Sequence, residues 1–151
     1  MNDKANILIV DDEEVVRHSH LRSLESADCS ARAAGGGIEA LQVMEQSPAD
    51  VVLLDLSMPG LSGMDVLKTI KQRWPDSEVV VITGYPSIDS AKEAVRLGAF
   101  NYLAKPLGPD EVIKAANDAI NQKRWGLRSD QREPRHIEFS AQKRVNEFTS
   151  H

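Results

Sequence analysis

Short runs of apolar residues recur along the chain and predict buried strands. The runs are rich in β-branched or bulky side chains and are too short for helices. They lie at Ile7–Val10, Val51–Leu54, Val79–Ile82 and, more weakly, Tyr102–Ala104. A fifth run, Cys29–Ala34, is poorer and is supported mainly by its place in the spacing.

The segments between and after these runs have helical periodicity. Each carries one apolar stripe, which predicts an amphipathic helix with one buried face. The stripes are Val16, Leu21 and Leu24; Ala40, Leu41 and Met44; Met64, Leu67 and Ile70; Ile88, Ala91 and Val95; and Ile113, Ala116 and Ile120. Strand starts recur about every 21 to 28 residues, the length of one βα unit. The pattern therefore predicts an α/β fold with a five-stranded parallel sheet and helices on both faces.

The periodicity divides the chain into a main domain, residues 1–122, and a C-terminal tail, residues 123–151. Regularity fades at Gly126, and the following polar, charged stretch is typical of a linker. Beyond it, four apolar residues are spaced to line one face of a short helix, although disorder is equally compatible with a segment this short. They are Ile137, Ala141, Val145 and Phe148.

Charge is distributed unevenly between these two parts. The chain has a formal charge of −5, but residues 1–122 hold 11 Lys+Arg against 19 Asp+Glu, and residues 123–151 hold 7 against 4. An acidic domain argues against direct nucleic-acid binding, whereas the tail is weakly basic. No run of about 18 apolar residues and no secretory signal is present, so we expect a soluble, cytoplasmic protein without membrane association. We interpret the single cysteine, Cys29, as a small core residue.

Residues with reactive side chains follow the predicted strands directly. Asp11 and Asp12 follow the first strand, and Asp55, Thr83 and Lys105 follow the third, fourth and fifth. Parallel strands deliver their C-terminal ends to one edge of the sheet, where such folds hold their sites. We therefore expect three carboxylates, a hydroxyl and an amine to converge there.

This set of groups points to a cation site that handles phosphate. Two carboxylates about 5 Å apart repel by roughly 3 kcal/mol at an effective dielectric near 20, so three need positive charge. Lys105 supplies one charge, and hard carboxylate oxygens without His or Cys select Mg²⁺. Asp55 is the plausible nucleophile, forming an aspartyl-phosphate, while Asp11 and Asp12 suit cation binding. Lys105 and Thr83 would contact the phosphoryl oxygens.

Each of these residues also has an ordinary structural explanation. Asp11 and Asp12 could cap the helix that begins near Glu13, and Asp55 could start a turn. Thr83 could simply end a strand, and Lys105 could be a solvated amine. It is their convergence at one edge that favours a site.

Two other function classes use similar groups. A magnesium-dependent phosphohydrolase would want a second acid/base residue beside the nucleophile, but Leu56 and Ser57 follow Asp55. A phosphohistidine shuttle could be built on His18 or His20, but that function is usually housed in a helical bundle. These histidines are better explained as residues of the first helix.

Four motifs in this order resemble the receiver domains of two-component response regulators. They are ILIVDDE, VVLLDLSMPGLSGMDVL, VVVITGY and FNYLAKPL. The resemblance runs from Ile7 to Ile120 and covers the whole predicted main domain. It implies a flavodoxin-like, CheY-like sheet with strand order 2-1-3-4-5.

The resemblance assigns roles around a Mg²⁺ ion. Asp12 and Asp55 would ligate it directly, Asp11 largely through water, and Ser57 through its backbone carbonyl. Asp55 would accept the phosphoryl group from a phosphohistidine on a sensor histidine kinase or histidine phosphotransfer protein. The receiver would catalyse only its own phosphorylation and dephosphorylation. The bond between Lys105 and Pro106 is commonly cis in this family.

The resemblance also implies an output. On phosphorylation Thr83 would move toward the phosphoryl group and Tyr102 would turn inward, reshaping the face of the fourth helix, fifth strand and fifth helix. Ser57 and Tyr85 flank the site and would tune the lifetime of the phosphoryl group. From its bulk, we predict that Tyr85→Ala shortens that lifetime.

The segment after the main domain leaves two possibilities open. About 29 residues follow the main domain, too few for the common output folds. The chain would be a stand-alone regulator with a downstream protein target, or the N-terminal part of a transcriptional activator. The segment TGYPSIDSAKEAVRLGAFNYLAKPL resembles receivers attached to ATPase-type activators. A homodimer through the fourth and fifth helices is possible.

Overall fold

Five βα units follow one another along the chain. The computed structural model describes residues 4–27 and 29–128. The strands are β1 (Asn6–Val10), β2 (Ser30–Ala34), β3 (Val51–Asp55), β4 (Glu78–Thr83) and β5 (Asn101–Ala104). The helices are α1 (Glu14–Ser26), α2 (Gly37–Gln46), α3 (Gly63–Arg73), α4 (Ile88–Arg96) and α5 (Pro109–Arg128). Every predicted strand is confirmed to within one residue at each end.

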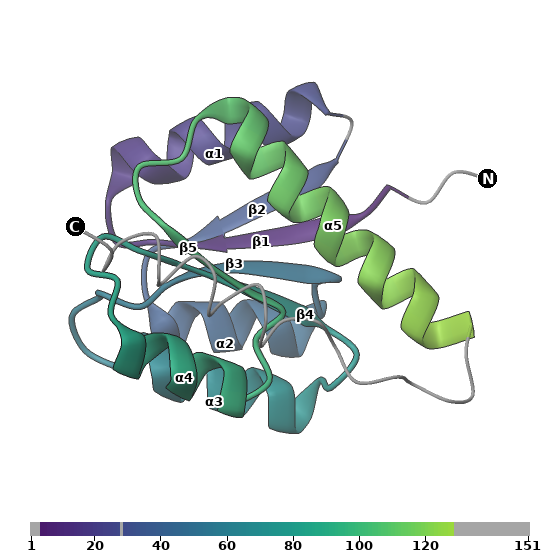
Figure 1. Ribbon diagram of the computed structural model, residues 1–151. Coiled ribbons are helices and arrows are strands. Elements are labelled where there is room, and N and C mark those ends of the chain that lie inside the picture. Colours follow the sequence, from purple (N-terminus) through teal and green to yellow (C-terminus); the bar gives the residue numbers. More distant parts are fainter. Residues whose placement is uncertain (1–3, 28, 129–151) are drawn as a thin grey trace.

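The strands form one parallel sheet in the order β2-β1-β3-β4-β5. Helices α1 and α5 cover one face, and α2, α3 and α4 cover the other (Figure 1). The predicted fold class and strand order are therefore confirmed. None of the described helices combines the length and apolar character needed to cross a bilayer.

Two hydrophobic cores lie on the two faces of the sheet. Successive strand side chains point to opposite faces, so Val52 and Leu54 pack toward α2, α3 and α4, while Val51 and Leu53 pack toward α1 and α5. All five residues of β3 are buried, which explains its continuous apolar run. Each buried aliphatic side chain contributes about 1.5–3 kcal/mol, so β3 holds the centre of the sheet in place.

Helix α5 continues beyond the expected end of the main domain. It runs to Arg128 and includes Gly126, so the helix extends into the first residues of the predicted tail. Lys123 Nζ lies 2.5 Å from Asp50 Oδ1, and this contact ties the helix to the loop before β3. A glycine inside a helix costs only about 1 kcal/mol, so tertiary contacts can carry a helix through it. The short helix suggested by Ile137 and its neighbours lies outside the described residues.

Candidate functional site

The four predicted strand-end positions lie together at the C-terminal edge of the sheet. Val10 pairs with Leu54, so Asp11, directly after β1, lies beside Asp55 at the end of β3. On the other side of β3, Asp55 pairs with Ile82, and the next residue is Thr83. The backbone N–H of Lys105 donates to the Thr83 carbonyl at 2.8 Å. The predicted convergence is confirmed.

Asp11 and Asp55 each divide their two oxygens in the same way. Oδ1 accepts a backbone N–H from two residues further on, at 2.9 Å from Glu13 and 3.0 Å from Ser57. Oδ2 faces Lys105 Nζ, at 2.8 Å from Asp11 and 3.1 Å from Asp55. These are turn contacts, and they occupy only one oxygen of each carboxylate. The N-cap of α1 is Glu13 and has no side-chain cap, so the structure does not support the capping role considered for Asp11 and Asp12.

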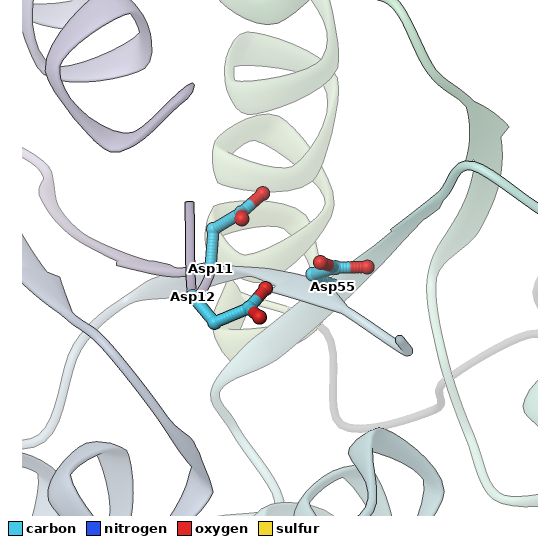
Figure 2. Close-up of side chains that lie close together, drawn as sticks. All are labelled: Asp11, Asp12 and Asp55. Carbon is cyan, nitrogen blue, oxygen red and sulfur yellow. The ribbon is translucent and has the colours of Figure 1, made fainter. Parts of the chain in front are cut away.

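A third carboxylate completes an acidic cluster. One oxygen from each of Asp11, Asp12 and Asp55 lies within 4.8 Å of the other two. Figure 2 shows the three side chains grouped at the ends of their strands, with Asp11 and Asp12 on one chain segment and Asp55 on the next. Asp11 and Asp55 are buried, whereas Asp12 is exposed. Crowded carboxylate oxygens of this kind are a donor set suited to a hard divalent cation, so the pocket can bind a metal.

The electrostatics of the cluster are unbalanced. Burial raises the pKa of Asp55 above its usual value, the Ser57 N–H and the Lys105 ammonium lower it in part, and the charge of Asp11 raises it again. Burial alone would lower the pKa of Lys105, but the hydrogen bonds and charges of Asp11 and Asp55 outweigh it and raise that pKa. One ammonium therefore serves two buried carboxylates and stays charged.

The loop after Asp55 is fixed by a close approach of α3. A Cβ atom added at Gly63 would lie 2.5 Å from the Leu56 Cα and 2.7 Å from the Asp55 carbonyl oxygen. Gly60 has a φ of +83°, in the left-handed region that glycine adopts without strain. The glycines of the motif around Asp55 therefore permit the tight path that presents this carboxylate.

The residues predicted to reorient on phosphorylation, Thr83 and Tyr102, are buried. The residues predicted to tune the lifetime of the phosphoryl group, Ser57 and Tyr85, are exposed. Thr83 is buried, and its Oγ1 accepts the Tyr85 N–H at 3.1 Å. Tyr102 is fully buried, with its hydroxyl at the start of α4. The Tyr85 side chain is 80% exposed, and Ser57 is also exposed. The Lys105–Pro106 peptide bond is cis, as the resemblance implied.

Two residues near the site were not anticipated. Glu13 Oε1 lies 3.5 Å from Lys105 Nζ and adds a further carboxylate to its surroundings. Arg17 Nη1 donates to the Asp11 backbone carbonyl at 2.7 Å and so ties α1 to the end of β1. Their sequence positions could have pointed to these two residues. Glu13 follows Asp12 directly, and Arg17 lies one helical turn after Glu13.

The two histidines of α1 lie in different environments. His18 is exposed and lies 3.5 Å from Glu14. His20 is only 5% exposed; burial lowers its pKa, with Asp11 raising it in part and Lys105 lowering it further. This agrees with their interpretation as residues of the first helix.

Comparisons with known proteins agree with the geometry. Residues 7–117 match the sequence model of the response regulator receiver domain. The DNA-binding transcriptional regulator NtrC of Escherichia coli K12 is 33% identical over 134 residues, which cover 89% of this chain and 28% of NtrC. A putative NtrX-like response regulator of Rickettsia felis is 32% identical over 110 residues, which cover 72% of this chain and 23% of that protein. The chain thus spans less than a third of these relatives.

Solved structures show the same fold. A response regulator receiver domain protein from Clostridium thermocellum superposes with a TM-score of 0.75 at 36% identity, covering 80% of this chain and 98% of that one. NtrX from Brucella abortus gives a TM-score of 0.79 at 30% identity, covering 83% of this chain and 29% of that one. Sequence, fold and site agree, and the chain belongs to the receiver domain family of two-component response regulators.

Proposed function

We propose that Asp55 accepts a phosphoryl group from a phosphohistidine of a sensor histidine kinase or a histidine phosphotransfer protein, in a reaction that requires Mg²⁺. The observation that carries this proposal is the Asp55 carboxylate itself. It is 3% exposed, lies 3.1 Å from Lys105 Nζ, and shares a cluster with two more carboxylates. A buried acid with a raised pKa in such surroundings is a candidate functional group.

The transfer needs positioning and charge neutralisation. An Asp55 oxygen forms a bond to phosphorus while the P–N bond to the donor imidazole breaks, and the imidazole leaves with its electron pair and is protonated. Asp11, Asp12, Asp55 and the Ser57 carbonyl would hold Mg²⁺, which when bound offsets negative charge on the phosphoryl oxygens. Lys105 offsets more of that charge, and the Thr83 hydroxyl donates to one oxygen. The receiver thus catalyses its own phosphorylation and dephosphorylation.

The output follows from Thr83 and Tyr102. We propose that phosphorylation moves Thr83 toward the phosphoryl group and favours the inward orientation of Tyr102. This change reshapes the α4-β5-α5 face, which then binds a downstream protein or an output domain. The relative NtrC is a DNA-binding transcriptional regulator, and this supports a role for the present chain as the receiver of a transcriptional activator. Self-association through the same face is a second candidate. Ser57 and Tyr85, which flank the site, would set how long the phosphoryl group survives.

The test uses a small phosphodonor. The protein is incubated with acetyl phosphate and Mg²⁺, and its intact mass is measured for the wild type, Asp55→Asn and a control, Asp118→Asn, on the exposed face of α5. We expect one phosphoryl mass in the wild type and the control, none in Asp55→Asn, and none when EDTA replaces Mg²⁺. An adduct on Asp55→Asn would refute the assignment. Turnover of excess acetyl phosphate without an adduct would indicate a hydrolase.

A further inference from the structure

Helices α3 and α4 begin with the same kind of residue but are capped differently. At α3, the N-cap Ser62 and Asp65 are paired: the Asp65 N–H donates to Ser62 Oγ at 3.2 Å, and Ser62 Oγ donates to Asp65 Oδ2 at 3.0 Å. At α4, the N-cap Ser87 accepts the Ser90 N–H at 3.0 Å, and the two hydroxyls lie 2.9 Å apart. The third helical residue is therefore an acid in α3 and a serine in α4.

A full capping box requires a long side chain at that third position. A Glu or Gln there reaches back to the N–H of the N-cap residue. The Ser90 side chain is much shorter, and the Ser87 N–H instead donates to the Tyr102 hydroxyl at 3.1 Å. The cap of α4 is thus completed by a residue of β5, fifteen positions away in the sequence.

Ser90 connects the parts of this cap. Its hydroxyl contacts Ser87 Oγ, lies 3.3 Å from the Ser87 carbonyl, and forms a close hydrogen bond with the Tyr102 hydroxyl. Tyr102 is fully buried, and its ring belongs to the core on the α2, α3 and α4 face. A buried tyrosine hydroxyl requires polar partners, and Ser87 and Ser90 provide them.

The same segment leads back to the site. Thr83 ends β4, its Oγ1 accepts the Tyr85 N–H, and Ser87 follows two residues later. The loop from Thr83 to Ser87 is therefore fixed at one end by a residue of the site and at the other by Tyr102.

We propose that Ser90 is a positioning residue that holds Tyr102 in its buried orientation and couples that orientation to the N-terminus of α4. If Tyr102 turns outward, the Ser87 N–H and the Ser90 hydroxyl both lose this partner, so the start of α4 must rearrange at the same time. The tyrosine and the helix end then behave as a single two-state element. The importance of that element for signalling rests on the proposed function, but the coupling itself does not.

The test uses the fact that the chain has two tyrosines, Tyr85 and Tyr102. Protein labelled with 3-fluorotyrosine gives two ¹⁹F resonances, which Tyr85→Phe assigns. The difference in shift between H₂O and D₂O then reports how much each ring is exposed. Spectra are recorded without phosphodonor or Mg²⁺ at a pH where the fluorophenol is protonated, for the wild type, Ser90→Ala and Ser90→Thr. Ser26→Ala, which removes a serine hydroxyl hydrogen-bonded within α1, is the matched control.

In the wild type and in Ser26→Ala we expect a Tyr102 resonance with a small solvent shift. In Ser90→Ala the inward-to-outward ratio should fall about fivefold, the equivalent of one neutral hydrogen bond, and the Tyr102 solvent shift should rise. Ser90→Thr, which keeps the hydroxyl, should resemble the wild type. An unchanged Tyr102 resonance in folded Ser90→Ala would overturn the proposal, as would equal changes in Ser90→Ala and Ser90→Thr.

The outcome is separable from the proposed function. Ser90 contacts none of the acidic cluster in the structure, so Ser90→Ala should gain the same phosphoryl mass as the wild type with acetyl phosphate. If the wild type itself gained no phosphoryl mass, the assignment of Asp55 would fail, and the ¹⁹F result on unphosphorylated protein would still decide the role of Ser90.

Discussion

The two edges of the sheet pair acids with lysines in different proportions. At the N-terminal edge, Asp50 has its own ammonium, since Lys123 Nζ lies 2.5 Å from Oδ1, and Oδ2 also accepts a backbone N–H. At the C-terminal edge, Asp11 and Asp55 share Lys105. The first edge is balanced in charge, and the second is crowded with negative charge.

This difference reverses the direction of the pKa shifts. Burial tends to raise the pKa of Asp50, but the hydrogen bonds from Lys123 and the Asn6 N–H overcome it and lower that pKa. Burial raises the pKa of Asp55, and its own hydrogen bonds do not overcome it. Each carboxylate accepts one backbone N–H and one lysine, so the opposite signs follow from the deeper burial of Asp55 and from the neighbouring charge of Asp11. The pairing at the first edge favours the folded state, whereas we expect the crowded edge to gain stability from a further cation.

The largest expected effect comes from removing a lysine at each edge. Lys71 Nζ lies 3.6 Å from Glu78, which is 2% exposed, and it also donates to two backbone carbonyls. Lys71→Met leaves a buried charge without this partner and should lower the free energy of unfolding by about 3 kcal/mol, with or without Mg²⁺. Without Mg²⁺, Lys105→Met should lower the free energy of unfolding by only about 1 kcal/mol, because Asp55 can take up a proton when its lysine partner is removed.

Urea denaturation at neutral pH measures both variants. Mg²⁺ should restore the stability of Lys105→Met, because the cation replaces the missing charge, and it should leave Lys71→Met unchanged. An equal response of the two variants to Mg²⁺ would show that the edges do not differ in the way described.

The next effect is the stabilisation by the metal itself. At ten times its dissociation constant, Mg²⁺ should raise the free energy of unfolding by about 1.4 kcal/mol. Asp12 is exposed, so Asp12→Asn should fold normally but lose most of this gain. Asp118→Asn, an exposed acid on α5, should keep it. Thermal denaturation with increasing Mg²⁺ checks this, and a full Mg²⁺ response in Asp12→Asn would remove that residue from the ligand set.

Neutralising one acid at each edge should change stability in opposite directions. Without metal, Asp55→Asn removes a charge that is disfavoured by burial and by Asp11, and it should stabilise the fold by about 1 kcal/mol. Asp50→Asn weakens the pair with Lys123 and should destabilise the fold by somewhat less, because both side chains are partly exposed. Urea denaturation in EDTA measures both. Changes of the same sign would contradict the comparison.

The sequence predicted the features that follow from local pattern and from the rule that parallel strands end at one edge. Apolar runs located the strands, and the residues directly after them located Asp11, Asp55, Thr83 and Lys105. These predictions succeeded because β3 and β4 are buried on both faces and leave a clear signal.

Contacts between distant segments could not be predicted in this way. The pair of Lys123 with Asp50 joins residues that are 73 positions apart, and Lys123 lies in the part of α5 beyond residue 122. The contact of Tyr102 with Ser87 depends on how β5 lies beside α4. Residues such as these have ordinary local patterns, and only the packing of the helices brings them together.

The smallest expected effect is a change in the acid limb of stability. The pKa of Asp50 in the folded protein is below its usual value of 3.8, so its contribution is present above that pH and is lost as the pH falls through the folded pKa. In Lys123→Met the main cause of the lowered pKa is gone. The variant should be less stable than the wild type by about 0.5 kcal/mol at pH 6, and the difference should shrink as the pH falls below 4.

Lys114→Met breaks an exposed pair on the same helix and serves as the control, with an expected change of a few tenths of a kcal/mol. Urea denaturation at several pH values between 6 and 3 measures the difference. If the difference in free energy of unfolding between wild type and Lys123→Met stayed constant over this range, Lys123 would act on stability through packing of its alkyl chain. The charge balance at this edge would then not be what distinguishes it from the site.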